Sequence, residues 1–283
     1  MLRDYGYKSF ATHPYYETGW SRNRIYPYLG FEEFTFIDDY PQQKMMRKYV
    51  SDQEMFEYVM NKMWYKEPGQ PLFLFGVSMQ NHGGFDYEGE NFVEDIELLD
   101  YSRNYPKAKQ YLNVSNETDK ALEYLLTSLA NYPEDTIVLF YGDHFPKVET
   151  KFYEELNGGE VDTLPEKMLQ YKIPFLIWAN FDIPDQTVEC TSINYLSRYL
   201  MEAAGFELSP YHQYLKEAET IIPAMNSQGY FSKEKNEFIT YDEAEGIEKE
   251  WIEKHSILQY NNLFDRKNRN ETFFGQYIPK KHD

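Results

Sequence analysis

The 283-residue sequence has little cysteine and little positive charge. Cys190 is its only cysteine, which excludes an intramolecular disulfide and a zinc site built from several thiolates. The 28 Lys and Arg residues face 47 Asp and Glu residues, so the formal net charge is -19 at pH 7, and no long basic run occurs. Because binding to a phosphate backbone needs clustered positive charge, we expect no nucleic-acid partner.

Long apolar runs are also missing. The sequence contains no stretch of about 18 or more apolar residues, so it predicts no transmembrane helix within these residues. Aromatic residues are abundant instead, with 27 Tyr and 20 Phe, and hydrophobic residues make up 42%. This composition is typical of a globular chain, and the length accommodates one large α/β domain with or without a small appendage.

The segment 136–144 carries the clearest functional pattern. Residues 136–141 are almost all aliphatic or aromatic, as in a strand that is buried on both faces of a parallel sheet, and Gly142 ends the run. Asp143 and His144 follow at once. Ligands of open α/β sheets lie beyond the carboxyl ends of the strands, so this carboxylate and imidazole are candidates to bind one metal ion. The alternative is that Asp143 caps a turn and His144 has no function.

Two more predicted strands end near a histidine. A strand over 8–12 leads to His13, and a buried strand over 72–79 is followed by His82 and two glycines. A fourth strand is expected over 173–179. Helices are expected over 52–65, 118–129, 192–204 and 242–263, while 206–240 looks irregular. This alternation predicts an α/β fold with a mainly parallel sheet, and several imidazoles at one sheet edge favour a functional site over chance packing.

Several sequence blocks resemble the extracellular catalytic domain of the lipoteichoic acid synthase family. The members of that family are phosphoglycerol transferases of the alkaline phosphatase and sulfatase superfamily. The matching blocks lie in family order over most of residues 5–205: 6–13, 20–22, 73–82, 118–122, 138–144, 174–178 and 191–196. The most specific of these are Gly142-Asp143-His144 after a buried strand, Asn81-His82 after an upstream strand, and Trp20-Ser21-Arg22 in a loop.

The resemblance implies a fold and a setting. We expect a three-layer α/β fold of the alkaline phosphatase/sulfatase type with a mainly parallel central sheet, lacking its first strand or strands. Residues 1–205 would form part of the catalytic domain, and 206–283 a C-terminal extension that packs on the same domain. The family's catalytic domain works on the extracellular face of the cell membrane, and the full-length protein is anchored by helices that precede that domain.

The resemblance also implies roles for individual residues. Asp143 and His144 match two ligands of a divalent metal, Mn²⁺ or Mg²⁺. His82 matches a catalytic histidine that contacts the phosphate and serves in proton transfer. Trp20 and Arg22 match residues that bind glycerol phosphate, and His13 matches a histidine on the same wall of the pocket. The implied partner is a phospholipid headgroup or a glycerol phosphate polymer.

One departure from the family pattern predicts that the chain lacks activity on its own. The family's nucleophilic threonine and a further acidic metal ligand both precede the segment that matches His13, and the sequence has room for neither. Thr12 and Thr18 match neither position. We therefore expect a C-terminal portion of a longer enzyme that is inactive alone.

Two alternatives stay open. The first is a sulfatase, a phosphodiesterase or a phosphoethanolamine transferase of the same superfamily, although Cys190 is followed by Thr-Ser-Ile and not by the Pro-x-Arg of typical sulfatases. The second is a non-catalytic module that binds phosphate without turnover.

Overall fold

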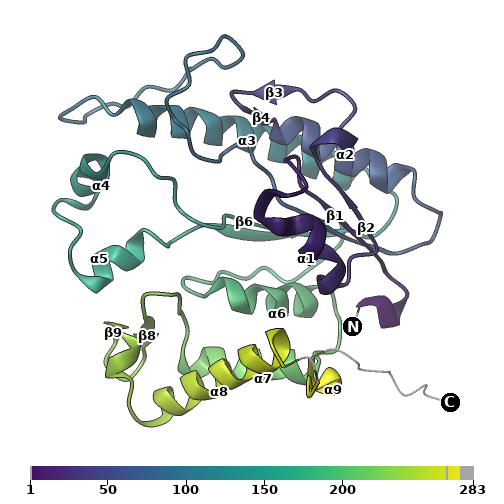
Figure 1. The fold of residues 1–283 in the computed structure, drawn as a ribbon, viewed down its shortest axis with the longest axis vertical. Coiled ribbons are helices and arrows are strands. Elements are labelled where there is room, and N and C mark those ends of the chain that lie inside the picture. The colour runs from purple at the N-terminus through teal and green to yellow at the C-terminus, as the bar shows by residue number, and fades with distance from the viewer. Residues whose placement is uncertain (1, 266, 275–283) are drawn as a thin grey trace. The chain divides into compact units, whose positions relative to one another are not determined.

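The computed structural model describes residues 2–265 and 267–274, which fall into two compact units (Figure 1). The first unit comprises Leu2–Pro133 and Pro146–Gly159. The second comprises Glu134–Phe145 and, of the described residues, 160–265 and 267–274, and positions 275–283 of the expected C-terminal extension lie outside the described residues. The division of the chain at residue 205 stays a prediction.

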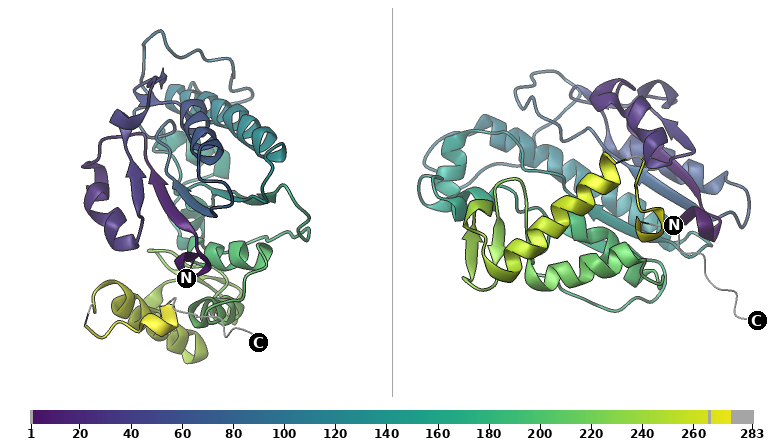
Figure 2. Two further views of the ribbon diagram at one scale, coloured as in Figure 1. Left: turned by 90° about the vertical axis from the view of Figure 1, so that its right-hand side faces the viewer. Right: turned by 60° about the horizontal axis from the view of Figure 1, so that its bottom comes forward.

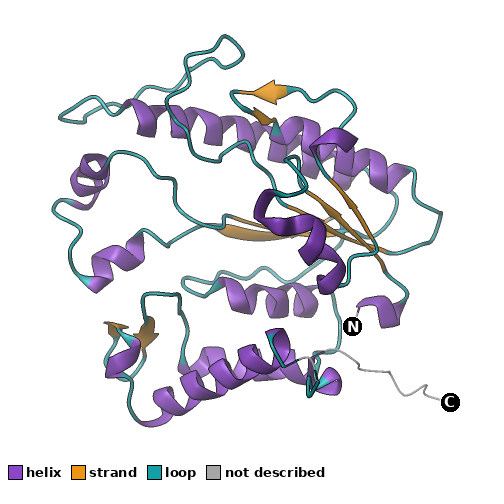
Figure 3. Ribbon diagram, in the orientation of Figure 1, coloured by secondary structure: helices purple, strands orange, loops and turns teal. Residues whose placement is uncertain are grey.

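A parallel sheet forms the centre of the first unit. Strand β1 (Lys8–Thr12) lies between β2 (Glu33–Thr35) and β5 (Leu72–Gly76), and both pairings are parallel. Figure 3 shows the three strands side by side with helices around them. The predicted α/β class is therefore confirmed, and the strands expected over 8–12 and 72–79 both form.

Three α-helices and a short hairpin accompany this sheet. They are α1 (Arg22–Leu29), α2 (Asp52–Trp64), α3 (Pro106–Ala130) and the hairpin of β3 (Met45–Met46) with β4 (Tyr49–Val50). Ser51 caps α2 as its sequence predicts, because its hydroxyl accepts a hydrogen bond from the Glu54 amide. The unit also contains α4 (Thr150–Asn157) and the 3₁₀ turns η1 (Leu2–Tyr5), η2 (Gly19–Ser21) and η3 (Ile37–Asp39).

Helix α3 begins well before the expected Thr118. Its first turns bury Gln110 and Asn113, whose side chains bond the backbone of the preceding loop at Tyr87 and Ile96. Because polar side chains are buried in these first turns, the sequence there shows no apolar periodicity. The sequence pattern therefore indicates a helix only in the later, leucine-rich turns. Helices α2 and α3 pack against each other along their lengths (Figure 1).

In the second unit, β6 (Ile137–Tyr141) pairs with β7 (Phe175–Ala179), and this pair is antiparallel. We expected β6 to end at the same sheet edge as β1 and β5, and the described backbone pairing does not join β6 to them. The reason is physical: a strand that is buried on both faces has the same apolar composition in either direction, and the connection between strands decides the pairing.

The rest of the second unit is mostly helical. It contains α5 (Leu164–Leu169), α6 (Ile193–Ala203), α7 (Pro210–Ile221), α8 (Gly246–Leu263) and α9 (Glu271–Phe274), with η4 (Tyr241–Glu243) and the hairpin of β8 (Tyr230–Ser232) and β9 (Glu237–Ile239). The expectation that 206–240 is irregular is wrong, since α7 and the hairpin fill it. Helix α7 packs on α6 and α8 around Tyr195, Leu215 and Ala218 (Figure 2).

Within residues 2–265 and 267–274, no helix combines the length and the apolar composition that crossing a bilayer requires.

Candidate functional site

His13 lies directly after β1 and is fully buried. Its Nδ1 is 2.7 Å from the carbonyl oxygen of Val77. A carbonyl only accepts, so Nδ1 carries the proton and Nε2 keeps a lone pair; Nε2 is buried and has no hydrogen-bond partner among the described residues. The pKa of His13 is lowered to about 4, mainly by burial and in part by the nearby Arg22 and His82, while the hydrogen bond to Val77 opposes the shift. His13 is thus a neutral acceptor at pH 7.

The indole of Trp20 brings the site residues of the first unit together. Its ring centroid lies 5.7 Å from that of His13 and 5.7 Å from that of His82, both edge-on, and the Arg22 guanidinium carbon lies 5.4 Å away. Trp20 keeps 54% of its surface exposed. Trp20 and Ser21 adopt left-handed backbone angles, with φ of 51° and 55°, a conformation that costs side-chain-bearing residues energy. Below, these four side chains, His13, Trp20, Arg22 and His82, are called the Trp20 cluster.

Arg22 begins α1 and retains unused donors. Its Nη1 donates to the Tyr26 hydroxyl at 3.2 Å, and the guanidinium lies over the Tyr26 ring at 5.9 Å. Its Nε is buried with no hydrogen-bond partner, and no carboxylate of the described residues forms an ion pair with it. A guanidinium in this state suits an oxyanion, since its fork binds two oxygens together.

His82 is exposed on the loop after β5. Arg47 and Tyr49, which no sequence motif indicates, hold that loop. The buried guanidinium of Arg47 donates to three carbonyl oxygens, those of Gln80 at 2.8 Å, His82 at 2.9 Å and Gly84 at 3.0 Å. The Tyr49 hydroxyl lies 3.1 Å from His82 Nδ1. No motif marks Arg47 or Tyr49, because both act through contacts distant in sequence.

The opposite side of the loop is fixed by a buried hydroxyl. Thr118 Oγ1 donates to Asp52 Oδ2 at 2.7 Å and accepts from Asn81 Nδ2 at 2.8 Å, while the Asp52 amide donates to the Gln80 side chain at 2.9 Å. Burial raises the pKa of Asp52 to about 6, partly offset by the hydrogen bonds from Thr118 and Ser78. Bonds from both sides therefore hold the His82 backbone in one position.

Thr12, the threonine beside His13, is fully buried in a cluster of hydroxyls. Its Oγ1 lies 2.5 Å from the Tyr40 hydroxyl and accepts from Thr35 at 3.0 Å. A hydroxyl enclosed in this way is not presented to a substrate. Thr18, the other threonine of this region, is exposed before η2.

Asp143 and His144 follow β6 in the second unit, and the Trp20 cluster belongs to the first unit. Their side chains are 78% and 65% exposed. Asp143 Oδ2 is 3.6 Å from His144 Nε2, and His144 Nδ1 is 2.8 Å from the Phe145 carbonyl, which leaves Nε2 with its lone pair. A carboxylate oxygen and an imidazole nitrogen side by side fit two positions of a Mn²⁺ or Mg²⁺ shell. No group of three or more such side chains occurs in the described part of the chain.

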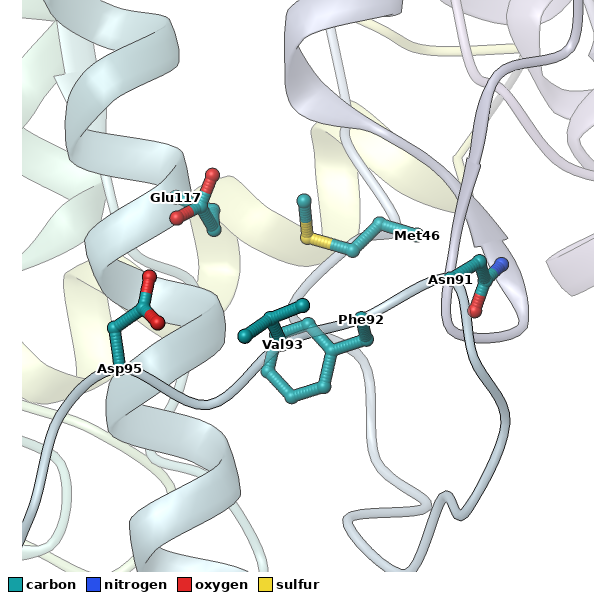
Figure 4. Close-up of a pocket in the computed structure, with 6 residues that line it drawn as sticks. All are labelled: Met46, Asn91, Phe92, Val93, Asp95 and Glu117. Carbon is teal, nitrogen blue, oxygen red and sulfur yellow. The ribbon is translucent and has the colours of Figure 1, made fainter.

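A shallow hollow lies elsewhere in the first unit (Figure 4). Its lining consists of Met46, Asn91, Phe92, Val93, Asp95 and Glu117. Glu117 pairs with Lys120, and the Asn91 amide donates to the carbonyls of Met45 and Arg47. The acidic loop over 88–100 thus rests on the β3–β4 hairpin, and the hollow contains no member of the Trp20 cluster.

Comparisons with known proteins agree with this fold. The Sulfatase family model matches residues 1–206. A putative cyclic beta-1,2-glucan modification protein of Rhizobium meliloti is 23% identical over 222 residues, which is 75% of this chain and 34% of that protein. Lipoteichoic acid synthase 1 of Bacillus subtilis is 22% identical over 178 residues, which is 61% of this chain and 27% of that protein. The chain thus spans about a third or less of the length of these relatives.

A solved structure supports the same conclusion. The Streptococcus pyogenes phosphoglycerol transferase GacH, in complex with sn-glycerol-1-phosphate, superimposes with a TM-score of 0.66 at 20% identity, covering 90% of this chain and 61% of that one. The expected alkaline phosphatase/sulfatase-like fold is therefore confirmed. Because the family model covers most of its length, the chain belongs to the sulfatase family of the alkaline phosphatase superfamily.

Proposed function

We propose that this chain forms part of a divalent-metal-dependent phosphoglycerol transferase that takes a glycerol phosphate group from a phospholipid headgroup. The observation that carries the proposal is the indole of Trp20, flanked by His13, His82 and Arg22 within 6 Å. This cluster combines an apolar face, a cation and two imidazoles, which is what a small polyol phosphate requires. The similarity to a phosphoglycerol transferase and to a lipoteichoic acid synthase supports the same substrate class.

Each member of the cluster has its own role in this proposal. Arg22 binds two phosphate oxygens through its free donors. His13 is fully buried, so in this proposal it packs edge-on against the Trp20 ring and adds no charge beside the phosphate. The Trp20 ring packs on the glycerol carbons, and His82 transfers a proton.

Asp143 and His144 are the proposed metal ligands. A divalent cation held there would neutralise charge on the transferring phosphoryl group. The proposed cation is Mn²⁺ or Mg²⁺, and further oxygen ligands must come from groups beyond this pair. In the proposal, the enzyme acts at the extracellular face of the membrane.

We further propose that the 283 residues alone do not complete a transfer. The described residues supply two metal donors, and Thr12 is enclosed by Tyr40 and Thr35. The test is incubation of the purified chain and Mn²⁺ with phosphatidylglycerol labelled in its acyl chains. We expect no burst of diacylglycerol, and a burst would overturn this part of the proposal.

A second candidate is a phosphate-binding module without turnover, favoured by the same count of two metal donors. Isothermal titration of glycerol phosphate, with and without Mn²⁺, separates the two. Binding that tightens with Mn²⁺ and disappears in an Asp143→Asn variant supports the transferase site. Binding of equal strength with and without Mn²⁺ supports the module. Absence of binding under both conditions contradicts both.

A further inference from the structure

We propose that Tyr49 and Arg47 are positioning residues that hold His82 in its Nδ1–H tautomer, so that the Nε2 lone pair is free to accept a proton from a substrate hydroxyl. The catalytic meaning rests on the proposed function above. The tautomer itself is a property of the chain without substrate.

The hydrogen-bond pattern of Tyr49 carries the argument. Its hydroxyl oxygen lies 3.1 Å from the Gly83 carbonyl oxygen and 3.1 Å from His82 Nδ1. The hydroxyl has one proton, and the carbonyl can only accept. If that proton pointed at the imidazole, two oxygens would face each other with no hydrogen between them. The proton therefore lies toward Gly83, the tyrosine oxygen accepts from His82, and Nδ1 carries the hydrogen.

Arg47 fixes the backbone on which this geometry depends. It donates to the carbonyls of Gln80, His82 and Gly84, so the carbonyls on both sides of Gly83 are held while the Gly83 carbonyl stays available to Tyr49. Arg47 sits in the β3–β4 turn with a left-handed φ of 54°, a strained conformation for a residue with a side chain. Its three hydrogen bonds offset that strain, and they tie the turn to the loop.

The tautomer decides what His82 can do when neutral. An Nδ1–H imidazole offers a lone pair at Nε2, which accepts a proton or a hydroxyl hydrogen bond but donates nothing to a phosphate oxygen. His13 is in the same state through Val77. Both neutral imidazoles beside Trp20 thus accept, and Arg22 is the donor to phosphate. The Tyr49 hydroxyl sets the tautomer of His82 and the Val77 carbonyl sets that of His13, and this division of roles follows from the two contacts.

The test is a two-bond ¹H–¹⁵N correlation spectrum of the ¹⁵N-histidine-labelled chain, without substrate, well above the ordinary histidine pKa of about 6.5. A His82→Asn variant assigns the resonance. We expect the Nδ1–H pattern for His82 in the wild type. In Tyr49→Phe, which keeps the ring and removes the hydroxyl, the population should shift to Nε2–H. An Nε2–H pattern in the wild type, or no shift in Tyr49→Phe, would overturn the proposal.

Two controls make the result specific. Tyr15→Phe removes a hydroxyl from the neighbouring ring, whose centroid lies 6.2 Å from that of Tyr49, and should leave the tautomer unchanged. The His13 signal reports on folding, because its bond to Val77 does not involve Tyr49. If the His82 tautomer assignment fails, glycerol phosphate binding by the chain is still expected. If the proposed function fails, the histidine spectrum is still expected to show the Nδ1–H pattern.

A second measurement addresses Arg47. An Arg47→Lys variant keeps the charge but replaces the fork by one ammonium group, which cannot reproduce three fixed bonds. We expect at least a tenfold faster amide hydrogen exchange over 80–84 and a mixture of His82 tautomers. Exchange rates and tautomer equal to those of the wild type would remove Arg47 from the proposal.

Discussion

The Nδ1 atom of His13 donates to the carbonyl oxygen of Val77, so a residue at the end of β1 is bonded to the chain just past β5. These strands are parallel neighbours, and their carboxyl ends meet at one edge. The contact explains why two imidazoles that are far apart in sequence converge on Trp20. Burial keeps His13 neutral, since the enclosed ring cannot be charged without losing hydration, while the hydrogen bond to Val77 acts in the opposite direction and raises its pKa.

The neutral state of His13 predicts a pH-dependent stability. Burial lowers its pKa from 6.5 to about 4 in the folded chain, so the unfolded chain takes up a proton first as pH falls. Its contribution is complete above pH 6.5 and is lost as pH falls toward 4, by up to about 3 kcal/mol. Urea unfolding of wild type and His13→Gln across this range measures it. The difference in unfolding free energy should grow with pH, and a difference that is constant with pH would contradict the burial argument.

Asp52 should make the stability depend on pH in the opposite direction to His13. Its pKa is raised from 3.8 to about 6 in the fold, so the folded chain holds the proton at a pH where the unfolded chain has lost it. Its contribution is complete below pH 3.8 and is lost as pH rises through 6, by an amount on the order of 3 kcal/mol. In the Asp52→Asn variant, the free energy of unfolding measured in urea should no longer show this loss as pH rises. The exposed Asp86→Asn serves as control, and an equal pH profile in both variants would refute the assignment.

Trp20 should matter for binding and little for folding. Since 54% of the residue is exposed, Trp20→Ala should change stability by less than about 1 kcal/mol. It should weaken glycerol phosphate binding roughly tenfold, about 1.4 kcal/mol, measured by titration calorimetry. Trp64→Ala is the matched control, because Trp64 is 53% exposed in the same unit and packs on Tyr132 away from the cluster. Equal affinities of the two variants would count against the Trp20 site.

Glycerol phosphate binding should be sensitive even to the replacement of Arg22 by lysine. Arg22→Lys keeps the charge and loses the two-pronged contact, so affinity for glycerol phosphate should fall roughly tenfold or more. Arg24→Lys, an exposed neighbour on α1, should bind as the wild type does. Calorimetry of both variants decides this. A loss of equal size in both would show that only net charge matters.

Local patterns in the sequence were sufficient for the regular elements. Strands β1, β5, β6 and β7 are short apolar runs between turn residues, and α2 carries a serine cap at its start. Helix α7 had a signal that was overlooked: Ser209 caps it and Pro210 occupies its first turn, the usual arrangement at a helix start. Few of its residues are buried apolar ones, so periodicity did not reveal it.

Long-range polar contacts explain the rest. The residues of the Trp20 cluster are candidates from the sequence because His13 and His82 follow predicted strands and because Trp20 and Arg22 lie in a block that resembles a known family. Arg47 and Tyr49 bond backbone atoms more than 30 positions away, and the early turns of α3 are buried through amide side chains. Such contacts have no periodic or motif signature. The antiparallel pairing of β6 was hidden for a related reason, since apolar runs do not encode direction.

The central claim is that Asp143 and His144 bind a divalent cation. Paramagnetic broadening by Mn²⁺ tests it most directly, because a bound Mn²⁺ ion broadens the signals of the ring that ligates it, and Asp143 Oδ2 lies 3.6 Å from His144 Nε2. In the spectrum of the ¹⁵N-histidine-labelled chain, Mn²⁺ should broaden the His144 ring signals and lose this effect in Asp143→Asn. A His144 signal that stays sharp, or equal broadening in both proteins, would contradict the claim.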